Sequence, residues 1–453
     1  MEESWRDAGF VKADFGDDFK WGVSTAAYQI EGAYNVDGKG LSIWDEFSNR
    51  KGKIKNNHNG NIACDFYNRY EEDVSLLQKL HIPNFRFSLS WPRIIPQGSG
   101  SINPKGIDYY NRLIDACLEK NITPWITLYH WDLPLELSQK GGWTNRDIVN
   151  WFTDYTEICV KNFGDRVKNW MVLNEPMAFT GAGYFLGLHA PGKRGMNSFL
   201  AAVHHAVLCQ AEAGRVIKSI LPNAQVGNTF SFSHIDSYSQ KPKDILAAER
   251  VDTLLNHLFA DPYMGLGYPV AKLKFLNRME RFVKPGDEEK MAFDADFIGI
   301  QNYTREIVKY SFFTPVIQAN LISAKKRNVP HTAMNWEIYP ESIYNVLKKV
   351  SRYSKAKNII VTENGAAFPD IIQDGKIHDE QRLEYIQNHL KQVLRAKQEG
   401  VNVNGYFIWS FLDNFEWAEG YTPRFGIVHV DYETQKRTPK KSALWYKYFL
   451  GGS

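Results

Sequence analysis

The sequence predicts a closed barrel of eight parallel strands surrounded by helices, a (β/α)8 or TIM barrel with extended loops after its strands. Eight short apolar runs each end near a polar residue, and stretches with a helical period of about 3.6 residues lie between them. No linker rich in Gly, Ser or Pro divides the 453 residues. We therefore expect residues 1–453 to form one barrel domain that carries any active site.

The apolar runs have the composition of strands that are buried on both faces, as in an all-parallel sheet. They are Phe19–Ser24, Asn84–Ser88, Thr123–His130, Val167–Glu175, Gln225–Phe230, Phe297–Tyr303, Asn358–Glu363 and Gly405–Trp409. Eight strands alternating with helices are the number that closes such a barrel.

Apolar residues between these runs recur at helical spacing. Tyr70, Val74, Leu77 and Leu80 share one face of a predicted helix, and residues 107–117 and 383–394 show the same pattern. The alternative is an open doubly wound sheet, which would carry a glycine-rich phosphate turn after its first strand. Neither G-x-G-x-x-G nor G-x-x-x-x-G-K-[ST] occurs in the chain, so the barrel is favoured.

Composition and charge exclude several classes of partner. The chain has 54 Lys and Arg against 51 Asp and Glu, a formal net charge of +3, which gives no reason to expect nucleic acid. No run of eighteen apolar residues occurs, and the charged first twenty residues lack an export signal, so we expect a soluble chain with no membrane partner. Four widely separated cysteines without a C-x-x-C pair predict reduced core thiols and a cytoplasmic location.

The polar residues at the ends of the eight runs should meet in space, because the active site of such a barrel forms where its strands end. These residues are Gln29, Arg86, His130, Asn174, Glu175, Asn228, Tyr303, Glu363 and Trp409. The set pairs two carboxylates with groups that hydrogen bond hydroxyls, and Trp131, Trp409 and Trp417 add flat apolar faces for a sugar ring. Paired carboxylates in such surroundings are typical of glycoside hydrolysis.

Three segments resemble the retaining β-glucosidases of glycoside hydrolase family 1. They are FKWGVSTAAYQIEG at 19–32, the N-E-P triplet at 174–176 and IIVTENG at 359–365, and the resemblance covers nearly the whole chain. It implies that Glu363 is the nucleophile and Glu175 the general acid and base. The implied activity is hydrolysis of terminal non-reducing β-D-glucosyl residues through a covalent glycosyl-enzyme, with β-galactosyl and β-fucosyl groups left open.

The resemblance also implies roles for the other site residues. Arg86 and Tyr303 look like the pair that binds the nucleophile and keeps it ionised. The residues that look like substrate ligands are Gln29, His130, Asn174 and Glu416 for hydroxyl groups, Tyr303 beside the nucleophile, Trp409 for stacking, Trp417 for a further hydroxyl and Trp336 for the leaving group. Glu416 stands where relatives that cleave 6-phosphoglycosides carry a small polar residue, so we expect an unphosphorylated sugar.

Two departures from the family pattern lie near the catalytic residues, and the first changes the surroundings of the nucleophile. Gln301-Asn302 replaces the Asn-Tyr that many relatives have before Tyr303, and Met177-Ala178 replaces Trp-Cys after the N-E-P triplet. We expect these changes to alter aglycone preference rather than the reaction.

Other classes of function fit the sequence less well. A metal enzyme would need a clustered ligand set, but H-E-x-x-H is absent and the adjacent His204 and His205 point apart on a helix, so we expect no metal and no cofactor. A sugar-binding barrel without chemistry would have lost a glutamate, and a thioglycosidase would carry Gln in place of Glu175. The expected partners are small β-glycosides or short oligosaccharides. The natural substrate and the oligomeric state stay open.

Overall fold

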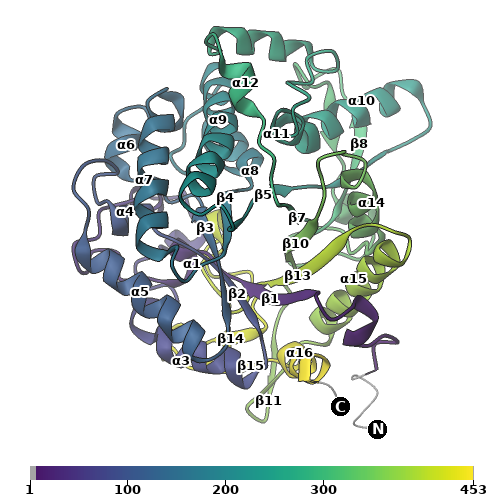
Figure 1. Ribbon diagram of the computed structural model, residues 1–453. Coiled ribbons are helices and arrows are strands. Elements are labelled where there is room, and N and C mark those ends of the chain that lie inside the picture. Colours follow the sequence, from purple (N-terminus) through teal and green to yellow (C-terminus); the bar gives the residue numbers. More distant parts are fainter. Residues whose placement is uncertain (1–6, 452–453) are drawn as a thin grey trace.

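Eight parallel strands close into a barrel with helices packed around its outside (Figure 1). The computed structural model describes residues 7–451. Around the barrel the strands follow the order β1, β2, β3, β4, β5, β7, β10, β13 and back to β1. Their bounds are β1 Lys20–Ser24, β2 Asn84–Ser88, β3 Thr123–Tyr129, β4 Asn169–Asn174, β5 Gln225–Ser231, β7 Phe297–Gln301, β10 Ile359–Asn364 and β13 Val403–Trp409. The predicted fold class is confirmed.

The helices connect successive strands and form the outer layer. Their bounds are α1 Ala27–Ile30, α2 Ile43–Ser48, α3 Phe66–Lys79, α4 Trp91–Ile94, α5 Pro104–Glu119, α6 Leu135–Gln139, α7 Ile148–Phe163, α8 Pro176–Thr180, α9 Met196–Ile220, α10 Pro242–Asp252, α11 Leu258–Tyr263, α12 Asp287–Met291, α13 Ala324–Arg327, α14 Glu341–Val350, α15 Glu380–Gln398 and α16 Lys441–Gly451. The three helices predicted from apolar spacing are α3, α5 and α15. None of the helices in residues 7–451 is long and apolar enough to span a membrane.

The inside of the barrel is filled by side chains. Trp125, Met171, Phe297, Ile360 and Phe407 form one buried cluster contributed by five different strands. Gly22 on β1 makes room for it, since a Cβ atom at that position would collide with the ring of Phe407. The cluster closes the lower part of the barrel, so only its upper end can hold a ligand.

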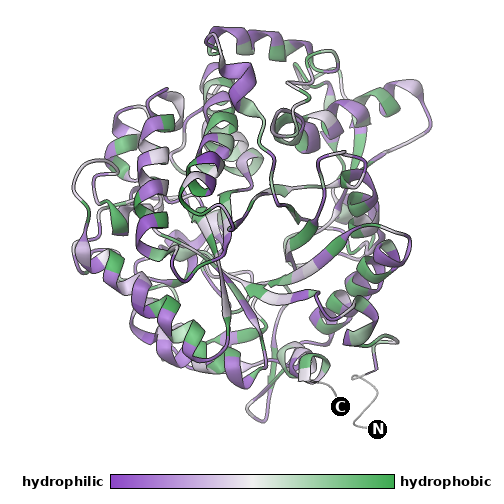
Figure 2. Ribbon diagram, in the orientation of Figure 1, coloured by the Kyte–Doolittle hydropathy of each residue, from purple (hydrophilic) through white to green (hydrophobic). Residues whose placement is uncertain are grey.

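The outer helices bury their apolar faces against the strands (Figure 2). The N-terminal segment packs against the last helix, α16. Lys12 donates through Nζ to the carbonyl oxygen of Leu450 at 3.2 Å. The ring of Phe10 packs edge-on against Phe449 at 5.7 Å between centroids.

Two barrel strands are prolonged into a small sheet at the mouth of the barrel. β6 (His234–Ser237) begins three residues after β5 ends, and β8 (Arg305–Tyr310) begins four residues after β7 ends. They pair in parallel, with His234 opposite Arg305, and β9 (Ala319–Leu321) adds an antiparallel edge. Two hairpins, β11 (Ile371–Gln373) with β12 (Lys376–His378) and β14 (Val428–Val430) with β15 (Arg437–Pro439), complete the extended loops.

Candidate active site

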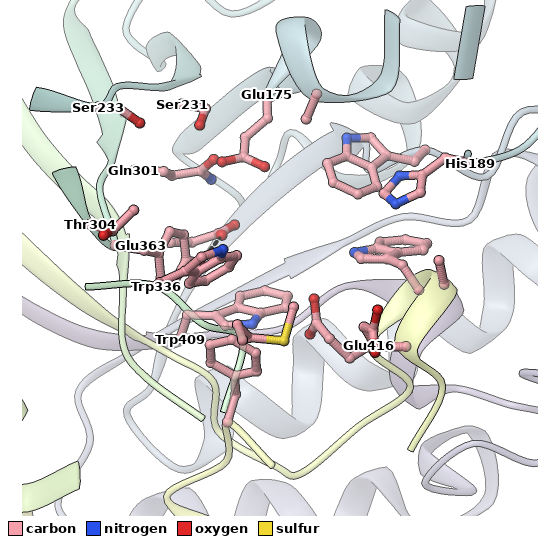
Figure 3. Close-up of a pocket in the computed structure, with 18 of the residues that line it drawn as sticks. Glu175, His189, Ser231, Ser233, Gln301, Thr304, Trp336, Glu363, Trp409 and Glu416 are labelled. Carbon is pink, nitrogen blue, oxygen red and sulfur yellow. Dashed lines mark hydrogen bonds between the residues drawn. The ribbon is translucent and has the colours of Figure 1, made fainter. Parts of the chain in front are cut away.

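A cavity of about 380 Å³ opens where the barrel strands end, and both predicted catalytic glutamates line it (Figure 3). The predicted residues on its wall are His130, Glu175, Tyr303, Trp336, Glu363, Trp409, Glu416 and Trp417. Gln29, Arg86 and Asn174 do not line it. Arg86 binds Glu363 and Asn174 binds His130, which both line it, and Gln29 binds Phe415, the neighbour of Glu416.

Glu363 lies on β10 and is held at both carboxylate oxygens. Tyr303 donates its hydroxyl to Oε2 at 2.6 Å, and Arg86 donates from Nη1 to Oε1. The guanidinium of Arg86 is itself fixed, since Nη2 donates to Oδ1 of Asn174 at 2.6 Å and Nε to Oγ1 of Thr127 at 3.0 Å. Burial raises the pKa of Glu363, and Arg86 and then Tyr303 oppose that rise. The two partners therefore limit the increase in pKa, although they do not reverse it.

Glu175 follows β4 directly and begins α8. Its backbone has φ 42°, a left-handed conformation that is uncommon for a residue other than glycine. Its N–H donates to the carbonyl oxygen of Thr229 at 3.0 Å, and Pro176 starts the helix without needing an N–H partner. Burial, and next the negative charge of Glu363, raise the pKa of Glu175 to about 8.

Buried polar atoms without partners surround one end of the cavity. Among residues 7–451 no protein group hydrogen bonds Nδ1 of His130, Oε1 of Gln29, Oε1 of Gln301 or Oε2 of Glu416. Buried polar atoms are nearly always paired, so four exceptions around one site indicate a ligand rich in hydroxyl groups.

The predicted hydroxyl ligands are linked to one another. Nε2 of His130 lies 2.9 Å from Nδ2 of Asn174, and burial holds the pKa of His130 well below its usual range, so its ring is neutral. Gln29 donates to Oδ1 of Asn414 at 3.0 Å and to the carbonyl oxygen of Phe415 at 2.8 Å, which ties α1 to the loop that carries Glu416.

Burial, followed by the charge of Glu363, raises the pKa of Glu416 to about 8. The side chain is therefore mostly uncharged at pH 7. This modifies the expected exclusion of 6-phosphosugars, because repulsion of a phosphate requires the ionised carboxylate.

Aromatic rings make two faces of the cavity. The ring of Trp131 lies 4.5 Å from that of Trp417, and the ring of His130 stacks on Trp409 at 5.8 Å. Trp336 is half-buried and packs against Tyr303 with 5.3 Å between ring centroids. Trp409 precedes a cis peptide bond to Ser410.

One strand-end residue does not reach the site. Asn228 accepts from the N–H of Leu173 at 2.8 Å and donates to Gln210 at 3.3 Å, so it joins β5 to its neighbours instead. The interpretation of Asn228 as a cavity residue was wrong, because its side chain satisfies a backbone group between two strands.

The structure adds cavity residues that were not assigned to the site from the sequence. They are Ala178, His189, Ser231, Phe232, Ser233, Gln301, Thr304, Glu306, Met334, Ala418, Glu419 and Phe425, while Trp131 lines the cavity as predicted. Ser231 follows the strand-end rule that identified Asn174, but the apolar run was ended one residue too early. Most of the others lie on loops or on short elements at the barrel mouth, such as α8 and β8, where no clear periodic pattern indicates which way a side chain points.

One group of side chains in residues 7–451 has the spacing of a metal site, away from the cavity. Ligand atoms of Asp370, Asp413 and His429 lie within 4.8 Å of one another. Lys440 already binds Asp370 at 2.9 Å and Asp413 at 2.8 Å, so an ammonium group occupies this position. His204 and His205 bind different partners, Asp287 and the carbonyl oxygen of Trp143, and so cannot share an ion.

Residues 11–451 match the family described as Glycosyl hydrolase family 1. The chain belongs to glycosyl hydrolase family 1. It is 45% identical over 434 residues to Beta-glucosidase A of Thermotoga maritima, covering 95% of this chain and 96% of the relative. It is also 45% identical to the 1,4-beta-D-glucan glucohydrolase of Thermotoga neapolitana, and the match covers 95% of this chain and 97% of that relative.

Solved structures of family 1 enzymes superpose closely. A family 1 β-glucosidase from Thermotoga maritima matches with a TM-score of 0.92 at 44% identity, covering 95% of this chain and 97% of that one. The same enzyme in complex with deoxynojirimycin matches with a TM-score of 0.92, and the match covers 96% of this chain and 98% of that one. The predictions of the family, the barrel and hydrolysis of the β-glucosidase type are confirmed.

Proposed function

We propose that this cavity hydrolyses terminal β-D-glucosyl groups with net retention, with Glu363 as nucleophile and Glu175 as general acid and base. The observation that carries the proposal is a pair of buried carboxyls on one cavity with different surroundings. Glu175 has a pKa of about 8 and keeps its proton at pH 7, whereas Glu363 has both oxygens bound by Arg86 and Tyr303. A proton donor beside a hydrogen-bonded carboxylate is what retaining hydrolysis requires.

In the first half of the reaction Glu175 gives its proton to the glycosidic oxygen while Glu363 attacks the anomeric carbon. The bond from that carbon to the aglycone breaks, the aglycone leaves as an alcohol, and an ester joins the sugar to Glu363. Arg86 and Tyr303 hold the nucleophile in one orientation. The negative charge of Glu363 is one cause of the raised pKa of Glu175. Because Glu363 loses this charge when the ester forms, the pKa of Glu175 then falls.

In the second half Glu175, now ionised, removes a proton from water. The hydroxide oxygen attacks the anomeric carbon and the ester bond to Glu363 breaks, which restores both carboxyls. Two inversions give a product with the configuration of the substrate. This geometry predicts a separation of about 5–5.5 Å between the two carboxyl groups.

Recognition of the glucosyl group is assigned to the end of the cavity that contains Glu416. Gln29, His130, Asn174 and Trp417 supply hydroxyl contacts, and Trp409 supplies a stacking face. The relatives support a glucosyl group, since a solved neighbour is titled as a complex with glucoimidazole. Four buried free cysteines support action in a reducing compartment, the cytoplasm.

The assignment of the nucleophile can be tested by trapping. A 2-deoxy-2-fluoro glucoside with a good leaving group should form the ester but release it slowly. Mass spectrometry of a digest should find the added sugar on the peptide that contains Glu363, in one copy per chain. A label on any other carboxyl would contradict the assignment.

A further inference from the structure

Besides the catalytic pair and the acidic residues of the loop after β13, the cavity is lined by one more acidic side chain, Glu306. Glu306 lies on β8, in the small sheet at the barrel mouth, and it lines the same cavity as Glu175 and Trp336. None of the sugar ligands assigned above comes from this sheet. Glu306 therefore borders the space on the aglycone side of the bond that is cleaved.

The strand geometry separates Glu306 from the ion pairs around it. Successive side chains of a strand point to opposite faces, so Arg305 lies on the other face of β8. There Arg305 binds Glu337 at 2.8 Å and Asp236 at 3.1 Å. Arg327 is also engaged with Glu337, at 2.6 Å. Both nearby guanidinium groups are thus paired with other carboxylates, and no protein hydrogen bond to the carboxyl of Glu306 is formed within residues 7–451.

A hydroxyl group on a fixed backbone lines the same cavity as this carboxyl. Ser233 precedes β6 and lines the cavity on the side where Figure 3 shows Ser231 and Thr304. Its backbone is pinned by Asn256, which accepts from the N–H at 2.9 Å and donates to the carbonyl oxygen at 2.8 Å. The hydroxyl of Thr304 is already committed to the carbonyl oxygen of Glu337 at 3.0 Å. Ser233 and Glu306 both line the cavity, and neither side chain has a protein hydrogen-bond partner within residues 7–451, so both can bind a ligand.

We propose that Glu306 and Ser233 bind hydroxyl groups of a sugar aglycone and so make the enzyme select glucosyl saccharides over glucosides with apolar aglycones. The proposal rests on the proposed function and adds the substrate class. Trp336 supplies the stacking face of the same subsite, which a sugar or an aromatic ring could use equally well. The carboxyl is the group that distinguishes them, because burying it against an apolar aglycone leaves it without a partner.

The protonation of Glu306 suits a hydroxyl ligand. Burial raises its pKa to about 7, the positive charge of Arg327 opposes the increase, and the negative charge of Glu337 adds to it. At a pH near its pKa, a carboxyl group can either accept a hydrogen bond in its ionised form or donate one in its protonated form. A sugar hydroxyl can be the partner in both cases, because it donates and accepts hydrogen bonds.

The test compares kcat/KM on cellobiose, octyl β-glucoside and p-nitrophenyl β-glucoside for the parent, Glu306→Gln and Glu306→Leu. Glu384→Gln, on the exposed face of α15, is the matched control for removing a carboxyl. We expect Glu306→Leu to lose about tenfold or more on cellobiose, the size of effect typical of a hydrogen bond to a charged group. It should keep or gain activity on octyl β-glucoside. Glu306→Gln should retain most activity on cellobiose, and unfolding midpoints of all variants should match the parent.

Two results would overturn the role of Glu306. One is an unchanged kcat/KM of Glu306→Leu on cellobiose, and the other is an equal loss on all three substrates. A parent that releases glucose from none of the three would instead overturn the proposed function, and this proposal with it.

Discussion

Glu175 and Glu416 show how burial sets the protonation of carboxyl groups around the cavity. Both have a pKa of about 8, first because they are buried and next because Glu363 is negative. The charge that the site needs is thus concentrated on Glu363, the one carboxylate with an arginine and a tyrosine bound to it.

The pH dependence of activity follows from these residues. Glu363 must be ionised, so activity falls as the pH drops through its pKa, which burial places above 4.5. Glu175 must be protonated, so activity also falls as the pH rises through about 8. We expect a bell-shaped profile of kcat/KM that loses its alkaline limb in Glu175→Gln.

Glu175→Gln should also discriminate between leaving groups. We expect a loss of about 10²–10⁴ in kcat/KM for an alkyl glucoside, but a far smaller loss for 2,4-dinitrophenyl β-glucoside, which needs little protonation. An equal loss on both substrates would contradict the role of Glu175 as acid.

The same pKa predicts a cost in stability. An acid whose pKa is raised in the folded state stabilises it fully below its unfolded pKa and loses that contribution as the pH rises to the folded value. Glu175→Gln should therefore gain stability over the parent between pH 4.5 and 8, by about 1.4 kcal/mol per pH unit. Urea unfolding at several pH values measures this, and a difference independent of pH would contradict it.

Exclusion of phosphorylated sugars should depend on the ionisation of Glu416. The parent should prefer p-nitrophenyl β-glucoside to its 6-phosphate, and the preference should increase from pH 7 to 9 as the carboxylate forms. In Glu416→Ser both the preference and its pH dependence should shrink, as steady-state kinetics on the two substrates would reveal. A parent that prefers the phosphorylated substrate would refute this role.

At the scale of elements, a buried ion-pair network anchors the loop that follows β13 and carries Glu416. Lys440 binds Asp413 at 2.8 Å, Arg424 binds the same carboxylate at 2.8 Å, and Arg382 binds Asp379 at 2.6 Å. The backbone of Gly426 also donates to Asp413, at 2.9 Å. Asp413 thereby ties the loop that carries Glu416 to the segments on either side of the hairpin β14–β15.

Removing one cation from this network should be costly. Lys440→Met removes one of the two cations that bind each of the buried carboxylates Asp370 and Asp413, and we expect a loss of about 3–5 kcal/mol in the free energy of unfolding. The adjacent Lys441→Met breaks a partly exposed pair with Glu380 and should cost less than about 1 kcal/mol. Denaturant unfolding of both variants decides this, and equal losses would show that the network does not matter.

The sequence predicted the barrel strands well for a physical reason. A strand covered on both faces must be apolar along its length, so β2 was delimited correctly and the ends of most others were placed within a residue or two. The sheet of β6, β8 and β9 was missed because it is only partly buried and its strands lack a clear pattern. For the same reason Ser233 and Glu306 were not predicted, whereas Glu175 and Glu363 were, since they end buried strands.

At the scale of the whole molecule, we propose that the chain behaves as a single domain. The contact of Phe10 with Phe449 and the bond from Lys12 to Leu450 join the N-terminal segment to α16. Limited proteolysis under native conditions should therefore give no stable fragment of the barrel, and heating should give one unfolding transition. Two separate transitions would contradict the single domain.

The central claim is that Glu363 and Glu175 hydrolyse β-glucosides by two successive displacements. Proton NMR of an aryl β-glucoside during its first turnovers tests it directly, because the anomeric protons of the two glucose forms are resolved before mutarotation mixes them. The account predicts β-glucose as the first product. α-Glucose as the first product would contradict it, since a single displacement by water would then have taken place.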